Sequence, residues 1–381
     1  MIYFDNAATT WQKPERVYQR VDEVLRHKSG NPSRGSHSAA LDASRVIFRV
    51  RKKLADFFNI EESSQLVFTK NATEASNLIF KGFLGRNDHV IISSLEHNAI
   101  TRPLYRLAEE GVIELTVLAT EVGRDEFLTN LKEALTPQTK LVALTHASNV
   151  TGNILPIAEV GTMLEDKEAA LLVDAAQIAG VVPIDRRELK ADFLVFTGHK
   201  ALFGPQGVGG FYFNAEFDCA PLLEGGTGGS SKERLNPDRY PDKYESGTLN
   251  TAGIAGLGAG LDFITETGLA EIRDHEEKLL TRLKSGLEEI EASEVLSSQI
   301  SQEQVGVLSF RIEGVDTATV GRLLNDRYEI AVRTGIHCAP LAHQSIGTYE
   351  TGTVRVSLSY FNTLAEVGEL LTALQEIIEL K

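Results

Sequence analysis

The chain has 381 residues, of which 42% are hydrophobic and 24% charged. This is the composition of an ordinary globular protein, and the length predicts about two domains with ample core. Its formal net charge is −15. Nucleic acids and anionic membranes require a basic surface, so we expect neither of them as a partner.

The chain has only two cysteines, Cys219 and Cys338, which is too few for a disulfide framework. This usage favours a reducing compartment, and we expect a cytoplasmic protein. The N-terminal sequence MIYFDNAATT has no basic segment followed by an apolar run, as a signal peptide would. No apolar stretch is long enough to predict a transmembrane helix.

The first part of the chain predicts a large α/β domain over residues 14–256. Helical periodicity is strong in PERVYQRVDEVLRHKS and in SAALDASRVIFRVRKKLADFFN. Between residues 66 and 213, short apolar runs then alternate with helical stretches, which is typical of βα units and a mostly parallel sheet. Seven strands are predicted, at LVFT, HVIISS, VIELTVLAT, LVALTHAS, ALLVDAAQ, FLVFTGH and GVGGFYF.

The second part of the chain has a different character. Residues 220–250 are rich in glycine, proline and charge, and a loop of this length is usually functional or lies at an interface. From residue 257 onward, helical segments mix with the strands VGVLSFRI, IAVRTG and TVRVSLS, and LAEVGELLTALQEIIEL closes the chain. We therefore expect a smaller α+β domain over residues 257–381, with residues 1–13 packing near it and near the active site.

Polar residues follow two of the predicted strands. Lys200 comes directly after FLVFT-GH, and Asp174 ends ALLVD with Gln177 three residues later. Ligands bind at the carboxyl edge of such sheets, and pyridoxal phosphate needs both a lysine for a Schiff base and a carboxylate beside its ring nitrogen. A solvated lysine and a helix-capping aspartate would explain the same two residues without any ligand.

A phosphate group needs an anchor, and the segment FTKNATEASNLIF has the required order of strand, turn and helix start. Ala72 and Thr73 lie in the predicted first turn, where free backbone N–H groups accept an anion. An ordinary cap by threonine or asparagine, with Glu74 favouring the helix dipole, explains the same pattern.

Ten motifs taken together resemble one family. In order, they are YFDNAATT, GNPSRGSH, NATEASN, EHNA, HASNVTG, VDAAQ, TGHK, YESGTLNT, RTGIHCAP and GTVRVSLSYFNT. Their order and separation are similar to those of the cysteine desulfurases, which are fold-type I pyridoxal-phosphate enzymes of the class V aminotransferase group. The resemblance covers nearly the whole chain. It implies a large domain built on a mostly parallel seven-stranded sheet.

The resemblance also implies roles for individual residues. Lys200 would bind the cofactor covalently, Asp174 would contact its ring nitrogen and Gln177 its phenolic oxygen. His97 would stack on the ring and assist proton transfer, although without the family it would be only a polar loop residue. The phosphate would be held by Ala72, Thr73, Thr197 and His199, together with Thr248 from the second subunit of a homodimer.

The substrate would be held by two further residues. Asn149 would lie near the substrate carboxylate and the ring oxygen. Arg355 would clamp that carboxylate, a task that suits a planar guanidinium better than an ammonium group. From the alternation in V-R-V alone, Arg355 could equally point outward from a strand.

The reaction that the resemblance implies removes sulfur from L-cysteine, giving L-alanine and a persulfide on Cys338. A thiolate is the reactive form, so a nearby cation should matter, and Arg333 and His337 are candidates. Cys219 matches no nucleophile motif and is interpreted as a small apolar residue. The family further implies a role in sulfur metabolism and iron–sulfur cluster assembly, a sulfur-acceptor protein and no metal site.

The short segment before Cys338 resembles the second, sulfur-mobilising and selenocysteine-lyase-like group of desulfurases. Ile336, where a histidine is frequent, and Pro340, directly after Ala339, depart from that group's pattern. L-Selenocysteine is therefore a second candidate substrate. The sequence is also compatible with a selenocysteine lyase, with another class V enzyme such as an aminotransferase or epimerase, and with an inactive cofactor-binding relay protein.

Overall fold

A computed structural model describes residues 1–381 except 33–36, 230–231, 298–299, 302 and 380–381. Parts of the motif GNPSRGSH and of the loop 220–250 therefore lie outside the described residues, as does the end of the closing helix. Among the described residues, no helix is long and apolar enough to cross a membrane.

The centre of the molecule is a seven-stranded sheet with the strand order β2-β8-β7-β6-β5-β3-β4. β8 is antiparallel to both of its neighbours, and the remaining pairs are parallel. The predicted mostly parallel sheet is thus confirmed. Its strands are β2 (Leu66–Thr69), β3 (Asp88–Ser93), β4 (Ile113–Leu118), β5 (Thr139–Thr145), β6 (Ala170–Asp174), β7 (Phe193–Thr197) and β8 (Gly209–Phe213).

The sheet is buried on both faces, which explains why its strands are apolar along their whole length. Along β5, Leu141 and Ala143 belong to one hydrophobic core, whereas Val142 and Leu144 belong to the other. The first core is covered by α3 (Ala72–Phe83) and α4 (Asn98–Glu109). The second is covered by α2 (Ser38–Phe57), α5 (Arg124–Ala134), α6 (Ile157–Leu164), α7 (Arg186–Leu189) and α8 (Thr251–Thr267).

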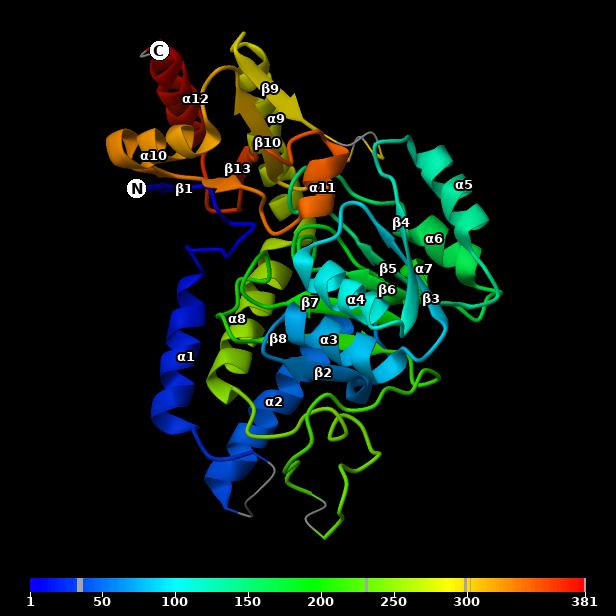
Figure 1. Cartoon of the computed structure of the whole chain (residues 1–381). Coiled ribbons are helices and arrows are strands. Elements are labelled where there is room, and N and C mark those ends of the chain that lie inside the picture. The colour runs from blue at the N-terminus through cyan, green and yellow to red at the C-terminus, as the bar shows by residue number, and fades with distance from the viewer. Residues whose placement is uncertain (33–36, 230–231, 298–299, 302, 380–381) are drawn as a thin grey trace.

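Two further elements complete this part of the chain. The helix α1 (Glu15–His27) packs against α8, as Figure 1 shows, and its residue Val24 shares a small core with Val46 and Ala255. A single 3-10 turn, η1 (Ser63–Gln65), leads into β2.

A smaller sheet with the strand order β12-β13-β10-β9 is antiparallel throughout. Its strands are β9 (Ser293–Leu296), β10 (Val307–Ile312), β12 (Arg333–Gly335) and β13 (Thr353–Ser357). Residues of α9 (Leu269–Glu288), α10 (Thr317–Tyr328) and α12 (Leu364–Glu379) form one core with this sheet. Figure 1 shows these elements, and both chain ends, above the large sheet.

The N-terminal strand joins the C-terminal part of the chain, because β1 (Ile2–Tyr3) pairs in parallel with β11 (Ile330–Ala331). The predicted strand IAVRTG is therefore split, since its first residues pair with β1 and its last with β13. The helical segments were expected from residue 257 onward, but α8 begins earlier, at Thr251, where the Asn250 side chain caps the backbone N–H of Gly253. α8 thus runs through residue 257, and the domain division there stays a prediction.

Candidate active site

A cavity of about 190 Å³ lies at the carboxyl ends of β6 and β7, the edge at which open α/β sheets bind ligands. The start of α3 and the strands β12 and β13 of the smaller sheet also contribute to its wall. The predicted site residues that line it are Ala72, Thr73, His97, Asn149, Asp174, Gln177, Thr197, His199, Lys200 and Arg355. Residues from nearly 300 positions apart in the chain therefore meet at one cavity.

Lys200 follows β7 and projects into this cavity. Desolvation lowers the pKa of its amine to about 8, with Arg355 and Arg333 adding to the effect and Asp174 opposing it. An amine with such a pKa is partly neutral near pH 8 and can act as a nucleophile or a base. Lys200 is thus a half-buried residue of the cavity wall, and its role as the cofactor lysine stays a prediction.

Asp174 ends β6 and is 4% exposed. Burial raises the pKa of its carboxyl, while a hydrogen bond from the backbone N–H of Ala176 and the charge of Lys200 lower it. No helix begins directly after Asp174, because residues 176–178 form a turn. The helix-cap interpretation is wrong, and the carboxyl faces the cavity with Lys200.

His97 does cap a helix. Its Nδ1 accepts a hydrogen bond from the backbone N–H of Ala99 at the start of α4, at 3.0 Å. Burial, together with the charges of Lys200 and nearby arginines, lowers the pKa of His97 to about 3. The imidazole is therefore neutral, and because Nδ1 accepts, its proton lies on Nε2.

The end of the cavity near α3 is suited to an anion. Asn71 caps α3 by accepting from the backbone N–H of Glu74, so Ala72 and Thr73 lie in the first turn at the cavity wall. The cap uses the backbone N–H of Glu74 and not those of Ala72 and Thr73, so the predicted anion site at these two residues stays a prediction. Two polar atoms nearby, Thr197 Oγ1 and His199 Nδ1, are buried and have no hydrogen-bond partner. Unpartnered buried polar atoms are costly, and an anionic group with several acceptor oxygens would satisfy them.

Arg355 is 1% exposed, so the interpretation as an outward-facing strand residue is wrong. Its Nη1 donates to the backbone oxygen of Asn149 at 2.9 Å, and its Nη2 contacts Asp5 Oδ1 at 2.7 Å. Its Nε has no partner. Gln177 also lines the cavity and donates its side-chain N–H to the backbone oxygen of Ala7 at 3.1 Å.

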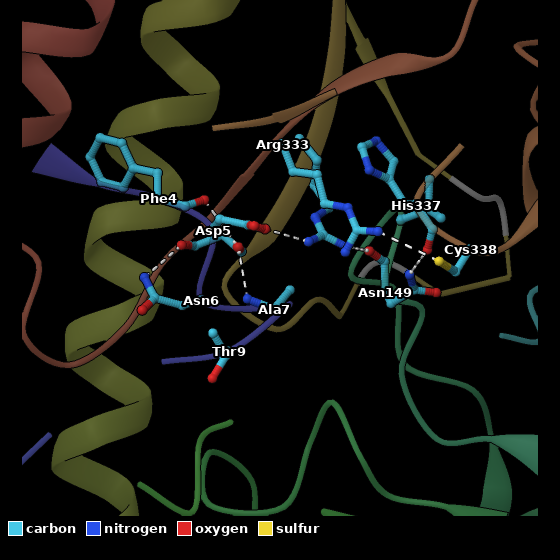
Figure 2. A network of polar contacts seen from close by, with 12 residues as sticks. Phe4, Asp5, Asn6, Ala7, Thr9, Asn149, Arg333, His337 and Cys338 are labelled. Atoms are coloured by element: carbon cyan, nitrogen blue, oxygen red, sulfur yellow. Dashed lines mark hydrogen bonds and ion pairs between the residues drawn. The ribbon is translucent and has the colours of Figure 1, made fainter. Parts of the chain in front are cut away.

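Cys338 is exposed. It lies next to His337 and near Arg333, which line the cavity, and Figure 2 shows the three residues together. Arg333 Nη2 is 3.5 Å from its Sγ. His337 points elsewhere, because its Nε2 is 2.8 Å from Thr353 Oγ1, and burial lowers the pKa of this histidine to about 2. Of the two predicted cations, only Arg333 therefore contacts the thiol.

The backbone around the cysteine is held in an unusual conformation. His337 and Cys338 have φ angles of 50° and 59°, in the left-handed region that non-glycine residues rarely adopt. The side chain of Asn149 donates to the His337 backbone oxygen, and the backbone N–H of Asn98 donates to the Cys338 backbone oxygen, each at 2.7 Å. The cysteine loop is thus fixed from two sides before α11 (Pro340–Ser345) begins.

Two predicted residues lie outside this region. Cys219 is 1% exposed within the core, where burial raises the pKa of its thiol to about 12, so it is an apolar packing residue. Thr248 lines another cavity, of about 230 Å³, with Lys70 and Glu74. Its contribution to the site of a second subunit stays a prediction.

Several lining residues were not predicted from the sequence. Thr145 ends β5 as Asp174 ends β6 and Thr197 ends β7, so its position at a strand end was a usable signal. Asp5 lies within the motif YFDNAATT, to which no residue role was attached. Among the described residues, no group of His, Cys, Asp or Glu side chains is arranged to hold a metal ion.

The fold and this site define a class of protein. The family described as Aminotransferase class-V matches residues 2–370, and the chain belongs to this family. A probable cysteine desulfurase of Methanothermobacter thermautotrophicus is 36% identical over 384 residues, which cover 99% of this chain and 94% of the relative. The chain is therefore similar, along its whole length, to a protein named for desulfuration of cysteine.

Solved structures agree with this assignment. The apo structure of a cysteine desulfurase from Thermococcus onnurineus has a TM-score of 0.91 at 34% identity, covering 99% of this chain and 94% of that one. A cysteine desulfurase from Escherichia coli, solved in an S-sulfonic acid form, has a TM-score of 0.88 at 29% identity with the same coverage. The fold of this chain is thus that of the cysteine desulfurases.

Proposed function

We propose that this protein is a cysteine desulfurase that converts L-cysteine to L-alanine and keeps the sulfur as a persulfide on Cys338. The observation that carries the proposal is the exposed thiol of Cys338, in contact with Arg333, beside a cavity lined by Lys200, Asp174 and Arg355. The lysine and the aspartate suit a pyridoxal cofactor, and the arginine suits the carboxylate of an amino-acid substrate. The exposed thiol adds a sulfur acceptor, which a desulfurase needs and an aminotransferase does not.

The residues present fit pyridoxal phosphate as the cofactor. Lys200 would bind its aldehyde, Asp174 would lie at its ring nitrogen, and Gln177 at its phenolic oxygen. Its phosphate would be held by the first turn of α3 with Thr197 and His199, which leave polar atoms unpartnered. When bound, this cofactor stabilises negative charge at the substrate Cα. His97, neutral and protonated on Nε2, would pack against the ring.

Two residues of the chain would handle the substrate backbone. Arg355 would bind the carboxylate, with Asn149 beside it, because the guanidinium lines the cavity and keeps an unpartnered Nε. Once the substrate amine has taken its place at the aldehyde, the released Lys200 Nζ would take the Cα proton, since a pKa of about 8 leaves part of the free amine neutral.

Sulfur transfer would occur at Cys338. The thiolate would attack the substrate sulfur. An S–S bond would form as the Cβ–S bond breaks, and Cβ would keep the electron pair of the broken bond. Protonation of that carbon gives the methyl group of alanine, so the overall change is L-cysteine plus enzyme thiol to L-alanine plus enzyme persulfide. Arg333 would stabilise the thiolate.

We further propose that the protein acts as a homodimer in which Thr248 reaches the partner's phosphate site. Because the cysteine loop is short and fixed, a sulfur-acceptor protein would have to approach Cys338 directly. Both cysteines are free, which favours a reducing compartment such as the cytoplasm.

The test is incubation of the purified holoenzyme with L-cysteine or L-selenocysteine, measuring alanine with and without reductant. Cysteine desulfuration should require a reductant for repeated turnover and should be lost in Cys338→Ala. Cys219→Ala is the matched control and should retain activity. Unchanged alanine formation by Cys338→Ala would contradict the proposed mechanism, and a preference for L-selenocysteine would indicate a selenocysteine lyase.

A further inference from the structure

Asp5 is a charged residue of the cavity region to which neither the motifs nor the proposed mechanism gives a role. Its carboxylate contacts the guanidinium of Arg355 at 2.7 Å, the residue that would bind the substrate carboxylate. Their side chains are 23% and 1% exposed, so the contact is shielded from bulk water. Shielding strengthens an ion pair that an exposed position would weaken.

The position of Asp5 is fixed by contacts that do not use its carboxylate. The Ser357 backbone N–H donates to the Phe4 oxygen at 2.7 Å, and the Ala7 backbone N–H donates to Ser357 Oγ at 2.8 Å. The side chain of Asn6 donates to the Ser357 backbone oxygen at 2.9 Å. The segment around Asp5 is therefore attached to the end of β13, two residues beyond Arg355, and its carboxylate is left to serve the arginine.

The charge balance of the cavity also depends on Asp5. Arg355 and Arg333 both line it. Burial lowers the pKa of the Arg355 guanidinium, the Asp5 carboxylate raises it, and the Arg333 charge lowers it further. Among the described residues, Asp5 is the only carboxylate in ion-pair contact with Arg355. Without it, a buried guanidinium would face a second cation with no counter-ion.

Arg355 is held at two points. Asp5 contacts Nη2, and the Asn149 backbone oxygen accepts from Nη1, so the plane of the guanidinium is fixed while Nε stays unpartnered. The Asn149 side chain in turn donates to the His337 backbone oxygen next to Cys338. Figure 2 shows the resulting series of contacts, from Asp5 on one side to the cysteine loop on the other.

We propose that Asp5 is a positioning residue that orients Arg355 to receive the substrate carboxylate. This inference rests on the proposed function, because it assumes that Arg355 binds that carboxylate. Asp5 acts only through Arg355 and does not touch the substrate, so its loss should weaken binding of carboxylate-bearing ligands and raise KM for L-cysteine more than it lowers kcat.

The experiment measures equilibrium binding to the holoenzyme through the absorbance of the bound cofactor. L-Alanine carries the carboxylate but no sulfur, and ethylamine lacks both. In Asp5→Ala we expect L-alanine to bind about tenfold more weakly, as loss of a charge-assisted contact implies, with ethylamine binding unchanged. Asp42→Ala, which removes an exposed ion pair with Arg45 on α2, is the matched control and should bind both ligands normally.

Variants of Arg355 distinguish the role of Arg355 in carboxylate binding from the role of Asp5 in positioning it. If Arg355→Lys and Arg355→Ala bind L-alanine normally, the assignment of Arg355 in the proposed function is wrong. If they bind it weakly and Asp5→Ala does not, only the role of Asp5 is overturned. Tighter L-alanine binding in Asp5→Ala would also overturn it, because Asp5 would then compete with the ligand.

A double variant tests whether Asp5 acts through the arginine. Asp5→Ala combined with Arg355→Ala should bind L-alanine as weakly as Arg355→Ala alone, since residues in one network are not additive. An additional tenfold loss would contradict the proposal. Asp5→Asn keeps the side-chain shape and should give a smaller loss of L-alanine binding than Asp5→Ala. If Asp5→Ala does not fold, L-alanine binding is measured with Asp5→Asn instead, and unchanged binding would overturn the proposal.

Discussion

At the scale of single residues, the two cysteines have opposite environments. Cys338 is exposed and contacts Arg333, whereas Cys219 lies in the core with the pKa of its thiol raised to about 12. Only one thiol per chain should therefore react with an alkylating agent in the folded protein.

Arg333→Gln removes the cation beside that thiol. We expect iodoacetamide to alkylate Cys338 several-fold more slowly at neutral pH, because the sulfur would lose its contact with the guanidinium of Arg333. Mass spectrometry of the two cysteine peptides measures the rate, with unreactive Cys219 as the control within the same chain. Equal rates in Arg333→Gln and the parent protein would show that another group activates Cys338.

Glu276 on α9 predicts a dependence of stability on pH. It is 3% exposed, and burial raises the pKa of its carboxyl to about 8, although Arg273 opposes this. Between its ordinary pKa of 4.5 and about 8, the folded protein holds a proton that the unfolded chain releases. Its contribution to stability is therefore lost as the pH rises through this window.

Glu276→Gln should remove that dependence. The free energy of unfolding of the variant, minus that of the parent, should increase from about pH 5 to about pH 8 by a few kcal/mol. Glu288→Gln changes an exposed carboxyl of the same helix and should show no such trend. A difference that is flat with pH would mean that Glu276 is ionised in the folded protein.

Some site residues could be predicted from the sequence, whereas the contacts between residues distant in the chain could not. Asp174 and Lys200 could be placed because Asp174 ends one buried strand and Lys200 follows another by three residues, and parallel strands bring their ends to one edge. The choice between Arg333 and His337 could not be made, because it depends on the hydrogen bond between His337 and Thr353, which lies 16 positions away. The partner of Arg355 was missed for the same reason, since Asp5 is 350 positions away.

At the scale of elements, an ion pair attaches the end of the long loop 220–250 to α2 and β2. Arg51 Nη1 and Nη2 lie 2.6 and 2.8 Å from the two carboxylate oxygens of Glu245, with side chains 7% and 6% exposed. The Phe68 backbone N–H also donates to Glu245. Glu245 lies three residues before Thr248, so these contacts hold the end of the loop, and with it Thr248, against β2 and α2.

Arg51→Met would leave the Glu245 carboxylate buried without a cation. We expect the free energy of unfolding to fall by about 3–5 kcal/mol, measured by urea denaturation. Arg45→Met removes an exposed ion pair of the same helix and should change stability by no more than about 1 kcal/mol. Similar small losses in both variants would show that Glu245 is satisfied without Arg51.

Helices and strands with a strong period could be predicted closely. α2 spans Ser38–Phe57 within the predicted segment, and all seven strands of the large sheet form where the apolar runs lie. The start of α8 was missed because the cap Asn250 and the glycines after it resemble a loop. β9 was missed because Ser293–Leu296 is a short strand with exposed Glu294, and only its pairing with β10 defines it.

At the scale of the whole molecule, the cavity needs both sheets. Its floor comes from the carboxyl edge of the large sheet, and Arg333 and Arg355 come from β12 and β13 of the smaller one. The parallel pairing of β1 with β11 brings the N-terminal segment, and with it Asp5, to the same place. The order of motifs along the chain predicts this assembly only through the family resemblance, because no local pattern encodes contacts between the two sheets.

The central claim is that sulfur from L-cysteine is transferred to Cys338, and the most direct measurement is mass spectrometry of the holoenzyme after L-cysteine without reductant. We predict the mass of one additional sulfur atom on the peptide that contains Cys338, removable by reductant, with alanine formed in equal amount. Cys219 should stay unmodified. Alanine formed with no added sulfur on the Cys338 peptide would contradict the account.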